Sequence, residues 1–139
     1  MGTVIRPELS KQNKYWIDKH RYYELKHFCL QYPVWKRACA MLDGFSKRPS
    51  DPAIFSSTNI HSDPTFKCAD ERLKYHERIS LIERAAADTD PTLASYILKA
   101  VTEGLSYTYV KARLEIPCGK DTYYDLYRRF FWLLSNSRD

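Results

Sequence analysis

The chain has 139 residues, of which 44% are hydrophobic and 28% are charged, and its formal net charge is +5. This composition is close to that of average folded domains, so it argues against a wholly disordered or a collagen-like chain. The length suffices for one main hydrophobic core. The longest uncharged apolar run, FFWLL at residues 130–134, is far shorter than the roughly 20 residues of a membrane-spanning helix, and the N-terminus lacks the apolar stretch of a signal peptide. We therefore expect a folded cytoplasmic protein with no membrane partner.

The four cysteines are spread along the chain and form no C-x-x-C pair. They are Cys29, Cys39, Cys68 and Cys118. This spacing is typical neither of a zinc ribbon nor of a dense disulfide framework, so we expect reduced, buried thiols, no metal site and no cofactor. A mixed Cys/His zinc site stays open as an alternative. Its ligands would include His27, Cys29, Cys68 and His76.

The charge is unevenly distributed along the chain. Residues 1–50 hold ten lysines and arginines against four acidic residues, residues 51–103 hold six against nine, and residues 104–139 hold six against four. Both ends are therefore basic and the middle is acidic. Such a distribution favours contact with a polyanion, and the phosphates of a nucleic acid are the obvious candidate.

Two helices are predicted before residue 43. Apolar residues recur at close to helical spacing from Lys14 to Gln31, which indicates a first helix. Proline is favoured in a first helical turn, so a second helix is predicted over Pro33–Leu42, which Gly44 ends. The apolar residues that carry this second pattern are Val34, Ala38, Met41 and Leu42. Residues 44–63 have no sustained period and are predicted to form a long loop. We expect residues 1–62 to be an N-terminal basic helical hairpin and a long loop.

The middle of the chain carries two helix-start signals. Ser62-Asp63-Pro64 combines a capping side chain with a proline, and the apolar pattern over residues 69–86 predicts a long helix that ends near Ala87. Asp90-Pro91 repeats the signal before a helix that Gly104 ends. The sequence has no run of alternating apolar and polar residues, flanked by hairpin-turn signals, that would predict a strand. The predicted fold class is all-α, a small domain of about six helices.

The last third of the chain has the proportions of a helix-turn-helix at residues 105–135 within a helical core at residues 63–139. Ser106 can cap a short helix, Ile116 can fill the turn, and a second helix starts near Gly119. Lys111 and Glu115 occupy the places where a compact helix-turn-helix usually has a small residue and a glycine. The expected buried face of the second helix consists of Tyr123, Leu126, Tyr127, Phe130 and Leu134.

The opposite face of this last helix carries the candidate DNA-binding residues. In a recognition helix the first two turns enter the major groove, where Lys and Arg can bond guanine and Asp can accept from cytosine. Thr and Tyr can add contacts to phosphate or to the methyl group of thymine. The candidates are Lys120, Asp121, Thr122, Tyr124, Asp125, Arg128 and Arg129. An ordinary helical hairpin with a basic solvated face is the structural alternative.

No sequence motif indicates catalysis. The Walker, dinucleotide-binding, zinc-protease and nucleophile-elbow motifs are all absent. The acidic residues of the middle helices alternate with arginines, so ion pairing is the expected role for them. We therefore expect no enzyme and no catalytic residue.

The run from Asp90 to Leu134, and above all IPCGKDTYYDLYRRFFWLL, resembles the C-terminal helix-turn-helix of small phage and prophage transcription regulators of the RinA and ArpU type, themselves similar to region 4 of bacterial sigma factors. The resemblance covers about a third of the chain. It implies a regulator of late or packaging genes that binds double-stranded promoter DNA in the cytoplasm of a bacterial host cell, with RNA polymerase as a candidate second partner.

Two other functions stay open at this point. A packaging protein of the small-terminase kind would also use a helix-turn-helix but would need a ring-forming interface. A protein-binding module, such as a phage inhibitor of a host complex, would turn its basic face to an acidic protein surface. A regulator that reads a palindromic site needs a two-fold homodimer, and we expect its interface on the aromatic-rich first helix.

Overall fold

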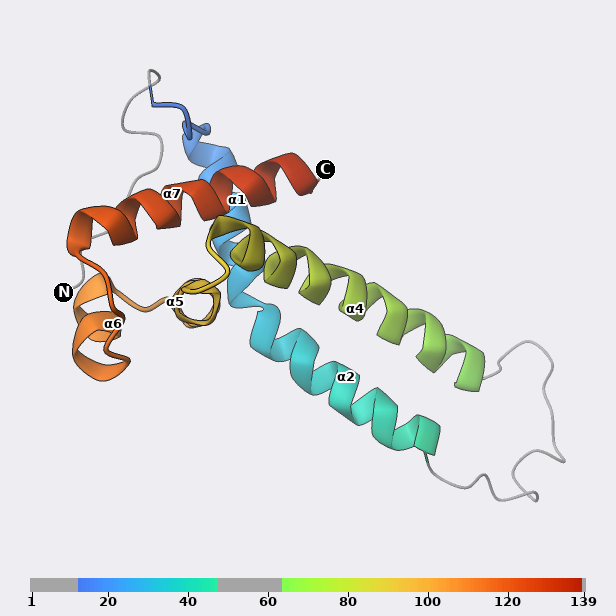
Figure 1. The fold of residues 1–139 in the computed structure, drawn as a ribbon. Helices are drawn as coiled ribbons and strands as arrows, with labels where there is room; N and C mark the ends of the chain where they lie inside the picture. The colour runs from blue at the N-terminus through green and yellow to red at the C-terminus, as the bar shows by residue number, and fades with distance from the viewer. Residues whose placement is uncertain (1–12, 48–63, 139) are drawn as a thin grey trace, which may run out of the picture.

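The computed structural model describes residues 13–47 and 64–138, and these residues form helices joined by short turns (Figure 1). No strand occurs in either range, so the prediction of an all-α fold is confirmed. The helices are α1 (Lys19–Leu30), α2 (Tyr32–Lys47), α4 (Pro64–Thr89), α5 (Ala94–Glu103), α6 (Tyr107–Arg113) and α7 (Lys120–Ser137).

The helices form a body and an arm. In Figure 1, α2 and α4 run antiparallel, side by side, and project away from a body that contains α1, α5, α6 and α7. The C-terminal part of α4 belongs to the body, because α7 and α5 pack on it. The core of the body lies where α1, α4, α5 and α7 meet. Its fully buried side chains include Tyr22, Leu25, Ile82, Ile97, Phe130, Phe131 and Leu134.

The first helix starts later than its apolar pattern predicts. Asn13 begins a turn in which its side-chain oxygen accepts from the backbone N–H of Tyr15 at 2.8 Å. Asp18 then acts as the N-cap, and its carboxylate accepts from the N–H of His20 at 2.9 Å. Local side-chain bonding of this kind competes with helix formation, which is why Asn and Asp favour turns and caps. The predicted start at Lys14 is therefore wrong, although the predicted end is correct within one residue.

The second helix differs from its prediction in both length and face. It continues through Gly44 to Lys47, because pairing with α4 offsets the roughly 1 kcal/mol that a glycine costs inside a helix. Its buried side chains are Trp35 and Cys39, while Val34 and Met41 are 53% and 67% exposed. The Trp35 ring lies 4.8 Å from that of Phe28. Because this contact across the α1–α2 junction holds Trp35 inward, Val34 and Met41 of the predicted apolar pattern face solvent.

The two N-terminal helices do not form a hairpin with each other. Only Gln31 separates α1 from α2, α1 packs on α5 and α7, and α2 packs mainly on α4. The expected domain boundary at residue 62 would thus place α2 and α4, which pack together, in different units. The predicted loop at residues 44–63 is helical up to residue 47, and the rest of it lies outside the described residues.

The first helix-start signal in the middle of the chain marks a helix boundary, whereas the second, Asp90-Pro91, leads into a turn and the predicted helix starts only at Ala94, with Leu93 as its N-cap. α4 begins at Pro64 and ends two residues after the predicted Ala87. Asp90 accepts from the N–H groups of Thr92 and Leu93 at 2.8 and 3.2 Å, and α5 starts after this turn. Gly104 ends α5 in the left-handed conformation with φ 69°, as predicted, since glycine adopts it without the steric cost of a Cβ.

The described cysteines are free thiols. Cys29 and Cys39 are buried, and burial raises the pKa of the Cys29 thiol well above its ordinary value. Among the described side chains, at residues 13–42 and 69–138, no group of three or more His, Cys, Asp or Glu is arranged to hold a metal ion; Cys68 of the alternative zinc site lies outside them. None of the helices within residues 13–47 and 64–138 has both the length and the apolar character needed to cross a membrane.

The orientation of α2 can be tested by substitution. Trp35→Ala should lower the free energy of unfolding by about 3–5 kcal/mol, because it empties a packed core position. Met41→Ala on the exposed side should change it by less than about 0.5 kcal/mol. Urea denaturation of both variants measures the difference. A larger loss for Met41→Ala than for Trp35→Ala would show that α2 faces α4 with its other side.

Candidate nucleic-acid interface

The short helix α6 begins as its sequence predicts. The hydroxyl of Ser106 accepts from the backbone N–H of Tyr109 at 3.2 Å, so serine satisfies one of the free N–H groups at the helix start. Val110 points inward and is fully buried. The helix is only seven residues long. The stability of α6 therefore depends on its contacts with the body and on the turn that follows.

The turn between α6 and α7 accommodates the two residues that depart from a compact helix-turn-helix. Glu115 has φ 56°, the left-handed conformation that glycine adopts more readily. The ammonium group of Lys111 donates to the carbonyl oxygen of Ile116 at 3.1 Å, and the Tyr107 hydroxyl donates to that of Cys118 at 3.1 Å. Ile116 itself is fully buried, which confirms that it fills the turn.

The last helix, α7, is anchored by a wide aromatic face. The predicted buried positions Tyr123, Leu126, Phe130 and Leu134 are buried, and Phe131, which the pattern did not include, is fully buried as well. Phe131 lies 5.2 Å from the Tyr22 ring of α1 and 4.9 Å from the Tyr127 ring. The hydroxyl groups of Tyr22 and Tyr127 share a hydrogen bond of 2.9 Å, and burial raises the pKa of Tyr127 well above its ordinary value.

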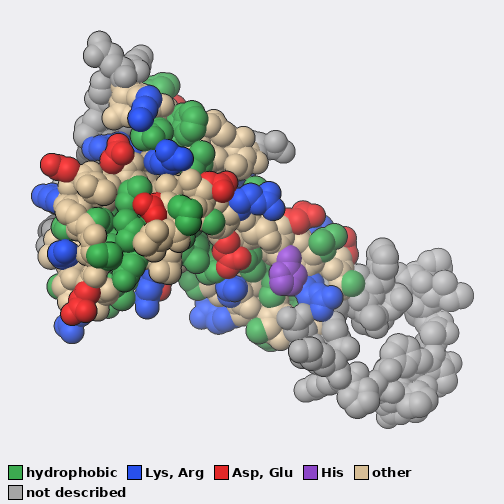
Figure 2. Space-filling model, in the orientation of Figure 1, with side chains coloured by type: hydrophobic (Ala, Val, Ile, Leu, Met, Phe, Trp, Pro, Cys, Tyr) green, Lys and Arg blue, Asp and Glu red, His purple; other side chains and the backbone are tan. Residues whose placement is uncertain are grey.

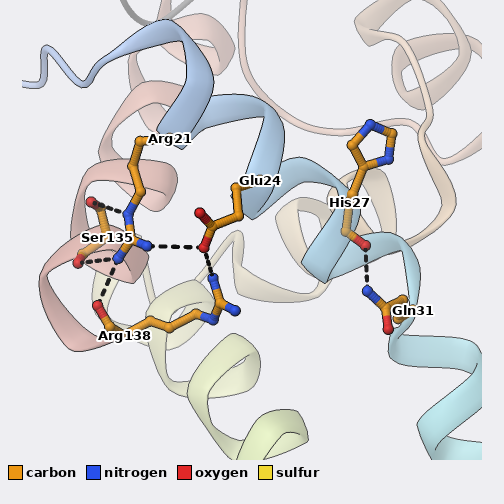
Figure 3. A network of polar contacts seen from close by, with 6 residues as sticks. All are labelled: Arg21, Glu24, His27, Gln31, Ser135 and Arg138. Atoms are coloured by element: carbon orange, nitrogen blue, oxygen red, sulfur yellow. Dashed lines mark hydrogen bonds and ion pairs between the residues drawn. The ribbon is translucent and has the colours of Figure 1, made fainter.

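The C-terminal end of α7 is fastened to α1 by a polar network (Figure 3). The Arg21 guanidinium donates to the Ser135 hydroxyl at 3.2 Å and to the carbonyl oxygens of Ser135 and Arg138 at 3.1 and 2.7 Å. These bonds satisfy carbonyls that have no partner within the helix. Glu24 accepts from Arg21 at 3.1 Å and also from Arg138. Together, the aromatic face and this network fix the position of α7 on the body.

The structure separates the seven predicted DNA-binding residues into two groups. Lys120, Asp121, Thr122 and Asp125 are exposed in the first two turns of α7. Tyr124, Arg128 and Arg129 are half-buried. The Tyr124 ring packs against the Tyr107 ring, with 6.3 Å between the ring centres. The ammonium group of Lys120 lies 5.6 Å from the centre of the Tyr124 ring. The four exposed residues all lie at the start of α7, so they form a compact polar surface.

Arg129 is directed toward the body. Its guanidinium donates to the Tyr15 hydroxyl and to the carbonyl oxygen of Asp88, both at 3.4 Å. Its Nε atom is buried without a hydrogen-bond partner. The helical spacing alone predicted a solvent-facing side chain, and the segment before α1 covers that side instead. Arg129 therefore joins α7 to the N-terminal segment and to the end of α4.

The exposed start of α7 has no excess of positive charge. Lys120 contributes one positive charge against the two negative charges of Asp121 and Asp125, and the half-buried Arg128 balances them one turn later. On the face seen in Figure 2, Lys and Arg side chains are interspersed with Asp and Glu. Because affinity for duplex DNA comes largely from cations near phosphates, this helix could supply base contacts more readily than affinity.

α6 also carries exposed residues that are not among the predicted DNA-binding residues. Tyr109 is 46% exposed, and Arg113 is exposed four residues later on the same helix. Their i, i+4 spacing was the available signal, since residues four apart lie on one side of a helix. These two side chains enlarge the polar surface next to the turn.

Comparison of the chain with models of protein families, with curated proteins and with solved structures finds no match.

The strain in the turn is open to a direct test. Glu115→Gly should raise the free energy of unfolding by about 0.5 kcal/mol, because the steric cost of the left-handed conformation exceeds the backbone entropy that glycine adds to the unfolded chain. Thermal or urea unfolding gives the value. Glu115→Ala serves as the control, since it removes the carboxylate but keeps the Cβ. Stabilisation by both substitutions alike would assign the effect to charge.

Proposed function

We propose that the chain is a sequence-specific, double-stranded-DNA-binding transcriptional regulator of the phage type, which places the start of α7 in the major groove. The observation that carries the proposal is the contrast between the two sides of α7. One side is fixed in the core by Tyr123 and Phe130, and the other presents Lys120, Asp121, Thr122 and Asp125 to solvent.

The exposed side chains have the chemistry of base readout. A lysine can donate to the O6 and N7 atoms of guanine, an aspartate can accept from the amino group of cytosine, and a threonine can contact the methyl group of thymine. Fixed attachment of α7 to the body supports the proposal, because base contacts require defined positions. The function that we propose involves no catalysis.

RNA polymerase and a second copy of the chain are the further partners in this proposal. Two aromatic residues of α1, where we expected the dimer interface, are packed inside the body: Tyr22 is fully buried and Phe28 is buried as well, whereas Tyr23 is half-buried. A two-fold dimer would therefore have to use a surface other than the buried side of α1.

The proposal predicts a division between specificity and stability. Lys120→Ala and Asp125→Ala should keep the melting temperature and relax the preference at individual base pairs, by about 1–3 kcal/mol for each lost base contact. Leu126→Ala should instead lower the free energy of unfolding by about 2–5 kcal/mol. The measurement is selection from a random pool of duplex DNA, followed by binding to single-base variants of the selected site.

Light scattering of the bound species distinguishes a dimer from the ring that a packaging protein would form. If Lys120→Ala and Asp125→Ala keep both their stability and the wild-type base preference, α7 does not read DNA.

One observation favours a second candidate function, the protein-binding inhibitor. Val34, Ala38 and Met41 form an apolar stripe on α2 at spacings of four and three, and two of its three members are more than half exposed. Of the charged side chains described on α2, Lys36 pairs with Glu83 of α4 at 3.7 Å, and Arg37 is an exposed positive charge beside the stripe. This combination fits an amphipathic helix whose apolar side is flanked by acidic residues.

This second candidate is tested with a labelled synthetic peptide that forms such an acidic amphipathic helix. Met41→Glu should abolish binding of the peptide, and Leu73→Glu, at an exposed apolar position of α4, should leave it unchanged. Fluorescence anisotropy measures the affinity. Equal binding by both variants, or none by the wild-type chain, contradicts this function.

A further inference from the structure

One side of α1 carries a row of basic and aromatic side chains. Lys19, His20, Tyr23, Lys26 and His27 occupy positions i, i+1, i+4, i+7 and i+8, which lie together on a helix surface. Lys19, His20 and His27 are exposed, and Tyr23 and Lys26 are half-buried. We call these five residues the basic stripe. The apolar side of the same helix is buried in the core, so the position of the stripe is fixed.

The positive charge of the stripe is not compensated by nearby acids. α1 contains one carboxylate, that of Glu24, and it is shared by the guanidinium groups of Arg21 and Arg138 (Figure 3). The Asp18 carboxylate, just before the helix, caps its first turn. Within the described ranges, none of the ion pairs found involves a side chain of the stripe. The side chain of Lys19 is exposed to solvent, and that of Lys26 is half-buried.

We propose that the basic stripe binds the phosphate backbone of duplex DNA, as a sequence-independent contact separate from the start of α7. The stripe spans nine residues, Lys19 to His27, or about 12 Å along the helix axis. One strand of duplex DNA presents a phosphate about every 3.4 Å of its axis, so about three phosphates match this length. Two ammonium groups, two imidazole rings and the Tyr23 hydroxyl can donate to them.

The chemistry of the stripe favours DNA over a membrane. An amphipathic helix that lies on a lipid surface needs exposed apolar side chains, and α1 buries its own against the body. The large hydrophobic side chains that are exposed in the described ranges lie on α2, α4 and α6. Four of the five side chains of the stripe are Lys or His, whereas the centres of protein interfaces are depleted in lysine. Phosphate is the anion that such a row fits best.

The stripe would complement the charge of α7. The exposed start of α7 has two acids and one base, so it contributes little to the attraction for phosphates. The stripe supplies that attraction from another helix. The choice of duplex DNA as partner rests on the proposed function, but binding at the stripe does not require α7 to read bases.

The experiment measures binding of the full chain to a labelled random-sequence duplex of 20 base pairs between 50 and 200 mM salt. Lys19→Gln/Lys26→Gln should weaken binding about tenfold or more at 100 mM salt and reduce the log-log salt slope by about two, since each neutralised phosphate contributes about 0.9. Lys74→Gln/Lys99→Gln is the control with the same loss of charge on α4 and α5, and it should bind like the wild type. Melting temperatures verify that both variants are folded.

The outcomes separate this inference from the proposed function. If the stripe variant binds the random duplex as the control does, the inference is overturned, even when a selected consensus site is still recognised through α7. If the stripe variant loses random-duplex binding and no consensus exists, the inference holds and the proposed function fails. Stripe-dependent binding of poly-glutamate without stripe-dependent binding of duplex would assign the surface to an acidic protein and overturn the inference.

Discussion

Tyr22 on α1 meets Tyr127 and Phe131 on α7, and the position of α7 depends on this contact. The hydroxyl bond between the two tyrosines satisfies polar groups that would otherwise be costly to bury. Arg21 adds bonds to the last carbonyls of α7. Residues more than 100 positions apart in the sequence thereby place the polar start of α7 at the surface.

Much of the fold could be predicted because it depends on local chemistry. Asp90, Gly104 and Ser106 act on backbone groups within a few residues, so their effects are independent of the rest of the molecule. The predicted exposure of Lys120 and Asp125 follows from helical spacing in the same way.

Other features could not be predicted because they depend on distant parts of the chain. The spacing of Val34 and Met41 predicted a helix correctly but did not show which side faces α4, and the Trp35–Phe28 contact decides that. Phe131 is buried because α7 packs on α4 and α1 at once, which makes its apolar side wider than one stripe. Arg129 points inward because the segment before α1 reaches it.

The central claim is that α1 and α7 form one cooperative unit that holds the proposed reading surface in place. Native-state hydrogen exchange with increasing denaturant tests it most directly, because it gives an opening free energy for each amide. The amides of the buried residues of α1 and α7 should converge on the same opening free energy, equal to that of global unfolding. A lower opening free energy for the whole of α7, with α1 still protected, would contradict the claim.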